Sequence, residues 1–126
     1  MSKIKIILIF TTLIFLFSCS KQSEEIKLIK EQSQNEEMIA AYKEGMNSLE
    51  MGDYFRASKK FLEVEILLPQ SQWASKSVLM ASYSYYLQNY YSLAISNLKR
   101  YLKTYPKDNN MAYAHYLLAM CYYETI

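Results

Sequence analysis

Two cysteines and one histidine are the side chains best suited to nucleophilic or metal-binding chemistry in this sequence. Cys121 lies in an apolar run at residues 116–123, where we expect a buried core thiol rather than a nucleophile. His115 has no cysteine, aspartate or second histidine at the spacing of metal ligands. Because Gly45 and Gly52 are the only glycines, a glycine-rich phosphate loop cannot form. The sequence therefore predicts no enzyme activity, no metal site and no cofactor.

Cys19 has a different chemistry, because it follows a short apolar leader. Lys3 and Lys5 precede an apolar run at residues 6–17, the layout of a secretory signal peptide with its apolar core of roughly 7–15 residues. Residues 16–19 (Leu-Phe-Ser-Cys) resemble a bacterial lipobox, in which the cysteine is acylated and becomes the new N-terminus. We predict a lipoprotein signal peptide at residues 1–18 and lipidation at Cys19. The alternative is an uncleaved anchor, or an ordinary signal peptide with a chance cysteine.

The residue after Cys19 indicates where the lipoprotein would be located, and the charge balance bears on which partners it could bind. Ser20 stands where an aspartate would retain a lipoprotein, which resembles lipoproteins sent to the outer membrane, anchored by lipid and facing the periplasm. Cleavage after residue 18 removes Lys3 and Lys5 from 14 basic residues and none of the 12 acidic ones, so the net charge falls close to zero. Without a basic stripe, nucleic acid is not an expected partner.

Residues 19–35 carry mostly polar side chains. Ile26, Leu28 and Ile29 are too sparse to form a core face, so we predict a polar tether between the lipidated cysteine and a domain at residues 36–126.

A repeat with a period of 37 residues runs through this domain. Gly52, Tyr54, Ala57, Phe61, Val64 and Pro69 recur as Asn89, Tyr91, Ala94, Leu98, Tyr101 and Pro106. A fixed period of this size indicates stacked helical hairpins that complete each other's core. The order of small, aromatic, alanine, aromatic and proline residues resembles the tetratricopeptide repeat. We predict an all-α tetratricopeptide-type solenoid with repeats at about 36–70 and 71–107 and a partial third at 108–126.

Capping residues and prolines set the expected helix limits. The helices should span about 36–51, 54–68, 72–88 and 91–105, with a fifth that is still running at residue 126. Asn35, Asp53 and Ser71 are the expected caps of the first three helices, and either Asn109 or Asn110 is the expected cap of the fifth.

Small residues recur where paired helices should cross. Gly45, Ser82 and Ala119 occupy one such position, and Ala57 and Ala94 occupy another. Small side chains let the helix axes approach to roughly 8–10 Å.

The first helix of each repeat carries aromatic and apolar side chains on the side that lines the concave groove in tetratricopeptide arrays. The residues predicted to contact a peptide are Tyr42, Met46, Leu79, Tyr83, Tyr86, Tyr116, Met120 and Tyr123. Tyrosine suits this role because it offers apolar area and keeps a hydroxyl for the peptide backbone. The alternative is that these tyrosines only pack between helices.

Two stretches are more specific than the general repeat: residues 79–86 (Leu-Met-x-x-Tyr-x-Tyr-Tyr) and residues 113–117 (Tyr-Ala-x-Tyr-Leu). They resemble the BamD family, the tetratricopeptide lipoproteins of the outer-membrane β-barrel assembly machinery, over about residues 38–126. The resemblance implies a scaffold that binds unfolded outer-membrane proteins and helps deliver them to the insertase BamA. Members of the family have more repeats than this chain, so we expect it to be a fragment, with exposed apolar surface on its last helix.

A second function of another class remains open at this point. The repeats of a cell-envelope lipoprotein could instead serve a structural role, by forming oligomers or by scaffolding other proteins.

Overall fold

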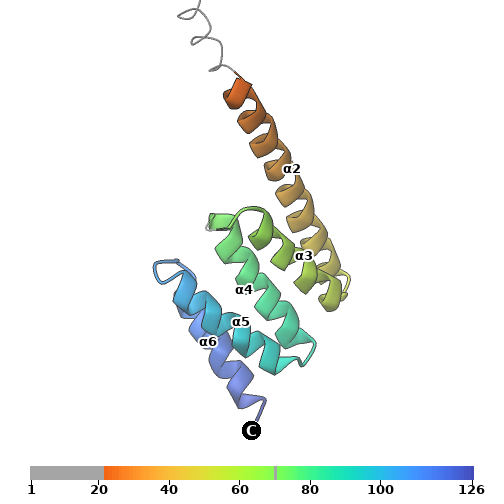
Figure 1. Cartoon of the computed structure of the whole chain (residues 1–126). Coiled ribbons are helices and arrows are strands. Elements are labelled where there is room, and N and C mark those ends of the chain that lie inside the picture. Colours follow the sequence, from red (N-terminus) through yellow and green to blue (C-terminus); the bar gives the residue numbers. More distant parts are fainter. Residues whose placement is uncertain (1–21, 70) are drawn as a thin grey trace, which may run out of the picture. The chain divides into compact units, whose positions relative to one another are not determined.

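The computed structural model describes residues 22–69 and 71–126, and the side chains of residues 30–69 and 71–126. Cys19 and the predicted signal peptide lie outside the described residues. The described part is entirely helical (Figure 1), as predicted. Its helices are α2 (Gln22–Glu50), α3 (Tyr54–Leu67), α4 (Gln72–Leu87), α5 (Tyr91–Thr104) and α6 (Met111–Tyr123).

The chain divides into a unit that ends at Ser33 and a compact unit at Gln34–Ile126, and every contact described below lies in the second unit. There α3 packs against α4, α4 against α5, and α5 against α6 (Figure 1). The C-terminal half of α2 packs on α3, where the rings of Tyr42 and Phe61 meet edge to face at 5.6 Å. The helices thus form two hairpins and the first helix of a third, as the repeat predicts.

The start of α2 differs from the expected one. The helix begins at Gln22, whereas the sequence analysis placed an N-cap at Asn35. The physical reason is that residues 22–34 contain glutamate, glutamine, lysine, leucine and isoleucine but no glycine or proline, so nothing interrupts a helix. None of the described helices is both long enough and apolar enough to span a membrane. The role of residues 19–35 as a lipid tether stays a prediction.

The other helix limits follow their caps. The side chain of Asp53 accepts a hydrogen bond from the Arg56 N–H at 3.1 Å, and Ser71 accepts one from the Ala74 N–H at 3.0 Å. Both residues therefore act as the N-caps that the sequence predicts. The C-terminal limits of α3, α4 and α5 agree with the expected ones to within a residue.

The turn inside each hairpin has the same backbone conformation. Gly52 has a φ of 78° and its repeat equivalent Asn89 has a φ of 61°. Glycine adopts this left-handed region without a steric cost, and asparagine tolerates it better than most other residues. The recurrence of Gly52 as Asn89 after 37 residues is explained by this shared turn.

Both hairpins bury the same layer of side chains. The residues with no exposed surface are Ala57, Phe61 and Val64 in α3, and Ala94, Leu98 and Tyr101 at the equivalent positions of α5. This confirms the predicted alignment of the two repeats. Gly45 has the expected packing role, because a Cβ atom there would lie 2.9 Å from the Phe61 ring.

Polar contacts join the second helices of the two hairpins. The guanidinium of Arg100 in α5 donates to both carboxylate oxygens of Glu65 in α3. The Tyr105 hydroxyl donates to the same carboxylate at 3.2 Å. Burial and the nearby Glu65 charge raise the pKa of Tyr105 to about 12, so its hydroxyl stays protonated as a donor.

Candidate functional site

The predicted contact residues lie on three helices, as their spacing requires: Tyr42 and Met46 on α2, Leu79, Tyr83 and Tyr86 on α4, and Tyr116, Met120 and Tyr123 on α6. Their surroundings differ. Tyr42 and Met46 pack against the cluster of Ala57, Phe61 and Ala81, and Tyr83 and Tyr86 pack against the cluster around Leu98. These four side chains are half-buried, so each serves the core and keeps part of its surface open.

Leu79 does not offer the surface that was expected of it. Its side chain is 5% exposed and belongs to the same core cluster as Leu98 and Leu117. The reason is that α4 contacts α3, α5 and α6, so this side of the helix is enclosed by its neighbours. Leu79 therefore contributes packing between helices.

The most open aromatic residues lie on α6. Tyr116 is 59% exposed and Tyr123 is 72% exposed. Tyr113 and Tyr122, which were not among the predicted contact residues, are exposed on the same helix, and the Tyr113 and Tyr116 rings lie 6.3 Å apart. This is the exposed apolar surface that the sequence predicts for the last helix. By their helical spacing Tyr113, Tyr116 and Tyr123 lie on one side of α6, whereas the Tyr122 ring lies next to Lys99 of α5. We call the first three tyrosines the α6 aromatic face.

Sequence reasoning missed a second aromatic group that extends from Tyr42. The ring of Trp73, at the start of α4, meets the Tyr42 ring at 5.0 Å in an edge-to-face contact. The Lys76 ammonium lies 5.6 Å from the Tyr42 ring and 6.0 Å from the Trp73 ring, within reach of a cation–π attraction. The signal that could have found this group is the i, i+3 spacing of Trp73 and Lys76, which places both on one side of α4.

Asp108 connects three elements next to this group. Its Oδ2 accepts a hydrogen bond from the Ser75 hydroxyl of α4 at 2.6 Å, and its Oδ1 accepts one from the Tyr101 hydroxyl of α5 at 2.7 Å. Oδ1 also accepts from the Asn110 backbone N–H at 2.8 Å. Burial alone would raise the pKa of Asp108, but the hydrogen bonds from Ser75, Tyr101 and Asn110 together bring it below the usual aspartate value.

The Asp108 contacts also correct the expected cap of α6. Asn110 occupies the N-cap position, but its side chain accepts no cap hydrogen bond and instead donates to Asp108. Asn109 does not cap the helix either. Asp108 is the repeat equivalent of Ser71, the N-cap of α4, so the 37-residue period itself carried the signal that this position accepts backbone hydrogen bonds.

The tyrosine hydroxyls of the surface are available as neutral hydrogen-bond donors. Burial, with the Glu124 charge as a further cause, raises the pKa of Tyr86. Burial also raises the pKa of Tyr113. Both phenols therefore keep their protons well above neutral pH and can donate to a peptide carbonyl.

The described residues offer little for catalysis. Cys121 is fully buried, and burial raises the pKa of its thiol, which makes it a poor nucleophile. No group of three metal-binding side chains occurs among the described residues.

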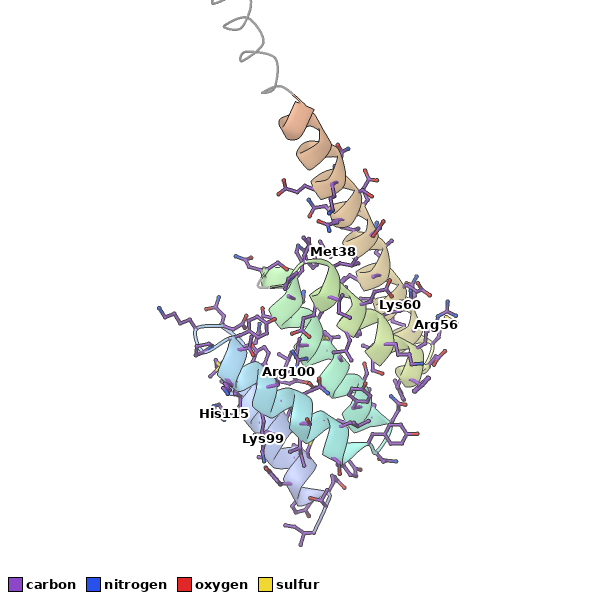
Figure 2. All side chains as sticks on the ribbon, viewed as in Figure 1. Met38, Arg56, Lys60, Lys99, Arg100 and His115 are labelled. Atoms are coloured by element: carbon purple, nitrogen blue, oxygen red, sulfur yellow. The ribbon has the colours of Figure 1, made fainter. Side chains whose placement is uncertain are left out.

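Lys60 pairs with Glu44 and Glu63, so part of the positive charge on α3 is neutralised. Figure 2 shows Lys60 on α3 and Arg100 on α5.

These hairpins and their shared burial pattern define the class of protein: a tetratricopeptide-type helical repeat. The sequence matches the profile of the YfiO family, described as outer membrane lipoproteins, over residues 13–126. The chain belongs to this family.

The named relatives that the chain resembles are outer membrane protein assembly factors, which is consistent with the family match. The chain is 39% identical over 85 residues to the outer membrane protein assembly factor BamD of Caulobacter vibrioides. This aligned region covers 68% of this chain and 28% of that protein. It is 31% identical over 85 residues to BamD of Rickettsia prowazekii, covering 68% of this chain and 34% of that protein. It is 33% identical over 76 residues to BamD of Neisseria gonorrhoeae, covering 60% of this chain and 28% of that protein. The resemblance to the BamD family is thereby confirmed, over about a third or less of the relatives' length.

Proposed function

We propose that this chain takes part in outer-membrane protein assembly by binding unfolded β-barrel proteins and helping to deliver them for insertion. The observation that carries the proposal is membership of the YfiO family combined with the open α6 aromatic face. The relatives that it matches are outer membrane protein assembly factors, which supports the same general role here. We propose BamA and other subunits of the machinery as its partners.

The proposed binding mode follows from the chemistry of the surface. Strands of outer-membrane barrels alternate apolar and polar side chains, so an extended segment of an unfolded barrel protein has its apolar side chains on one face. Aromatic rings such as those of Tyr116 and Tyr123 would cover that face. Their hydroxyls, together with those of Tyr83 and Tyr86, would donate to the strand's backbone carbonyls. Tyr42, Met46 and Met120 complete the surface with apolar contacts.

The test is the affinity for a peptide that copies the last strand of an outer-membrane barrel protein, measured by fluorescence anisotropy. Truncating an aromatic anchor costs ~2 kcal/mol or more, so Tyr116→Ala and Tyr83→Ala should each weaken binding about thirtyfold. Phe55→Ala is the matched control, because Phe55 is also an exposed aromatic residue but lies on α3. Equal affinities for wild type, Tyr116→Ala and Phe55→Ala would contradict the proposed surface, provided that circular dichroism shows the same helical content.

Lipidation at Cys19 is the second part of the proposal, since it would hold the chain at the periplasmic side of the outer membrane. The support is the lipobox-like run at residues 16–19 and the family description. Metabolic labelling with a fatty-acid probe should mark wild type and leave Cys19→Ala unlabelled. Equal label on both would refute the assignment.

A structural role is the alternative function, and the α6 aromatic face is also the observation that favours it. A second copy of the chain could cover the same three tyrosines. Sedimentation of the wild-type chain and of Tyr116→Ala separates the two functions: a Tyr116-dependent dimer that binds no barrel peptide would favour the structural role.

A further inference from the structure

A largely apolar stripe runs along the exposed side of α3. Phe55, Lys59, Leu62 and Ile66 follow one another at intervals of four, three and four residues, which places them on one side of the helix. Phe55 is 53% exposed and Ile66 is 78% exposed, while Leu62 is half-buried. We call these four residues the α3 stripe. The α6 aromatic face and the predicted peptide-contact residues lie on other helices.

The second repeat shows that packing does not require an apolar stripe at this place. The equivalent positions of α5 are all exposed and polar: Ser92, Ser96, Lys99 and Lys103. Leu62 also packs against the core, but Phe55 and Ile66 belong to none of the core clusters among the described residues. Exposed apolar side chains that the other repeat replaces with serine and lysine indicate a contact with another molecule.

The charges of α3 indicate which molecule fits the stripe. Arg56, Lys59 and Lys60 lie in the first half of the helix, and Glu63 and Glu65 lie in the second half. This order is the opposite of the one that the helix dipole favours. An antiparallel copy of the same helix would place the basic half of each α3 next to the acidic half of the other, so the stripe is complementary in charge to itself.

Two of these charges are suited to pair between copies. The other charged residues of α3 already pair within the chain. Lys59 has no carboxylate partner among the described residues, and its ammonium lies 4.3 Å from the centre of the Phe55 ring. Glu63 shares Lys60 with Glu44, and the Glu63 side chain is 46% exposed. An antiparallel copy would bring Lys59 next to an accessible carboxylate.

We propose that α3 pairs with α3 of a second copy of this chain, antiparallel and along the α3 stripe. Phe55 of each copy would lie opposite Ile66 of the other, and Lys59 would lie next to Glu63 of the other, because each pair is centred on the middle of the stripe. Intervals of four and three residues are those of paired helices. The pairing leaves the α6 aromatic face of each copy open, so it goes beyond the proposed function and does not depend on it.

Sedimentation equilibrium of the chain tests the pairing. A buried apolar side chain contributes about tenfold or more to an affinity, and a symmetric dimer loses it twice. Ile66→Lys should therefore weaken the dimer about a hundredfold or more. Ile39→Lys is the matched control, because Ile39 is an exposed isoleucine on α2. This control and Tyr116→Ala on α6 should leave the dimer unchanged.

Two charge reversals test the antiparallel arrangement. Lys59→Glu places two acidic residues side by side at each contact and Glu63→Lys places two basic ones, so each variant alone should dimerise about tenfold more weakly. An equimolar mixture of the two variants restores opposite charges at both contacts. The mixed dimer should therefore form with about the wild-type affinity, and high salt should reduce the difference between the mixture and the separate variants.

Three results would overturn the proposal. The first is a wild-type chain that stays monomeric up to about 1 mM. The second is a dimer that Ile66→Lys leaves intact or that Tyr116→Ala abolishes, because the contact would then lie elsewhere. The third is a mixture of Lys59→Glu and Glu63→Lys that dimerises no better than either variant alone. Circular dichroism checks that each variant keeps its helical content, and binding of the barrel peptide is unaffected by any of these results.

Discussion

Helices α4 and α6 occupy the same position in successive repeats but have opposite surroundings. In α4 the buried residues are Ala74, Ser75, Ser77, Val78, Leu79, Ala81, Ser82 and Ser84. In α6 only Ala114, Leu117 and Cys121 are buried. The difference arises because α4 has α3 on one side and α5 on the other, whereas among the described residues α6 packs mainly on α5.

Burial in this fold is therefore decided by the neighbouring helices as well as by the sequence of the helix itself. Ser82 has no exposed surface, whereas its equivalent Ala119 is exposed. Tyr86 is half-buried, whereas its equivalent Tyr123 is 72% exposed. In a stacked array each repeat contacts only its neighbours, so within residues 22–126 the same residue pattern is enclosed in α4 and open in α6.

The largest change in stability should come from enlarging the small residue at the position that Ser82 occupies in α4 and Ala119 occupies in α6. Ser82→Leu places a branched side chain in a fully buried site and should lower the free energy of unfolding by about 3 kcal/mol through overpacking. Ala119→Leu makes a similar change at an exposed site and should alter it by less than about 0.5 kcal/mol. Urea unfolding followed by circular dichroism measures both. Similar losses for the two variants would mean that α4 and α6 are not differently enclosed.

The next largest effect should come from breaking the hydrogen bonds of Asp108, which join α4 to the start of α6. Asp108 ties Ser75 of α4 to the turn before α6, and Asp108→Asn should cost about 1.5–2 kcal/mol because charge-assisted hydrogen bonds are lost. A matched change that keeps these contacts is Asn109→Ala, since the Asn109 side chain makes none of the Asp108 hydrogen bonds. Chemical unfolding at neutral pH should separate the two variants.

The pH dependence of the free energy of unfolding is an independent test of the contribution that Asp108 makes to stability. Its pKa is lowered in the folded state, so the stability that it contributes is present above the ordinary aspartate pKa of about 4. This contribution is lost as the pH falls below about 4 and through the folded-state pKa. Wild type should therefore lose more stability than Asp108→Asn between about pH 5 and pH 2. Parallel pH profiles for the two proteins would contradict the lowered pKa.

The smallest effect concerns a hydroxyl that α4 buries and α6 lacks. The Ser77 hydroxyl is buried and has no hydrogen-bond partner among the residues that the structure describes, and the equivalent residue in α6 is Ala114. Ser77→Ala should raise the free energy of unfolding by about 1 kcal/mol, because it removes an unsatisfied polar atom. Ser84→Ala is the control and should not stabilise, since the Ser84 hydroxyl donates to the Met80 carbonyl at 2.8 Å. A loss of stability in Ser77→Ala would show that the hydroxyl has a partner.

Much of the fold could be predicted from the sequence, because its signals are local and repeated. The period of 37 residues, the caps Asp53 and Ser71, and the turn at Gly52 fix the helices and their order. The start of α2 could not be placed, because a polar segment rich in helix formers is read equally well as a tether or as a helix.

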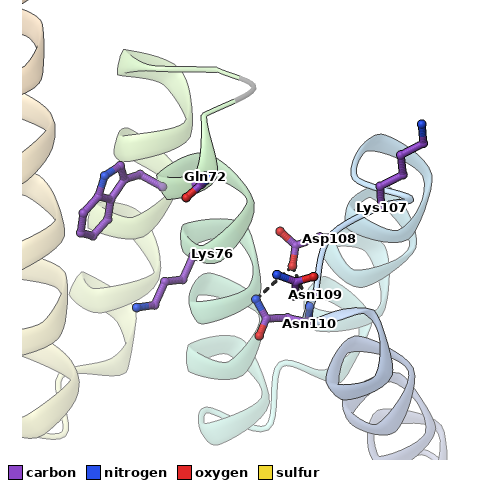
Figure 3. A pocket seen from close by; sticks show the side chains of 7 residues that line it. Gln72, Lys76, Lys107, Asp108, Asn109 and Asn110 are labelled. Atoms are coloured by element: carbon purple, nitrogen blue, oxygen red, sulfur yellow. Dashed lines mark hydrogen bonds between the residues drawn. The ribbon is translucent and has the colours of Figure 1, made fainter.

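The candidate site was predictable only in part. The spacing of Tyr116 and Tyr123 placed them on one helix, but their exposure depends on which helices surround α6. Leu79 follows the same spacing and is enclosed by its neighbours. The cavity between the start of α4 and the α5–α6 connection (Figure 3) was missed because two of its lining residues, Trp73 and Lys107, are separated in the sequence and line one cavity only when α4 packs beside that connection.

Site-specific crosslinking tests directly whether the open aromatic face of α6 receives unfolded barrel proteins. A photoreactive amino acid is placed at position 116 on α6 and, in a separate variant, at position 55 on α3, and each is crosslinked in the cell envelope. Both positions are exposed aromatic sites, so they differ in their helix and not in their access to solvent. We expect crosslinks to unfolded outer-membrane barrel proteins from position 116 and not from position 55. Equal crosslinking to these proteins from both positions, or crosslinks from position 116 only to a second copy of this chain, would contradict this expectation.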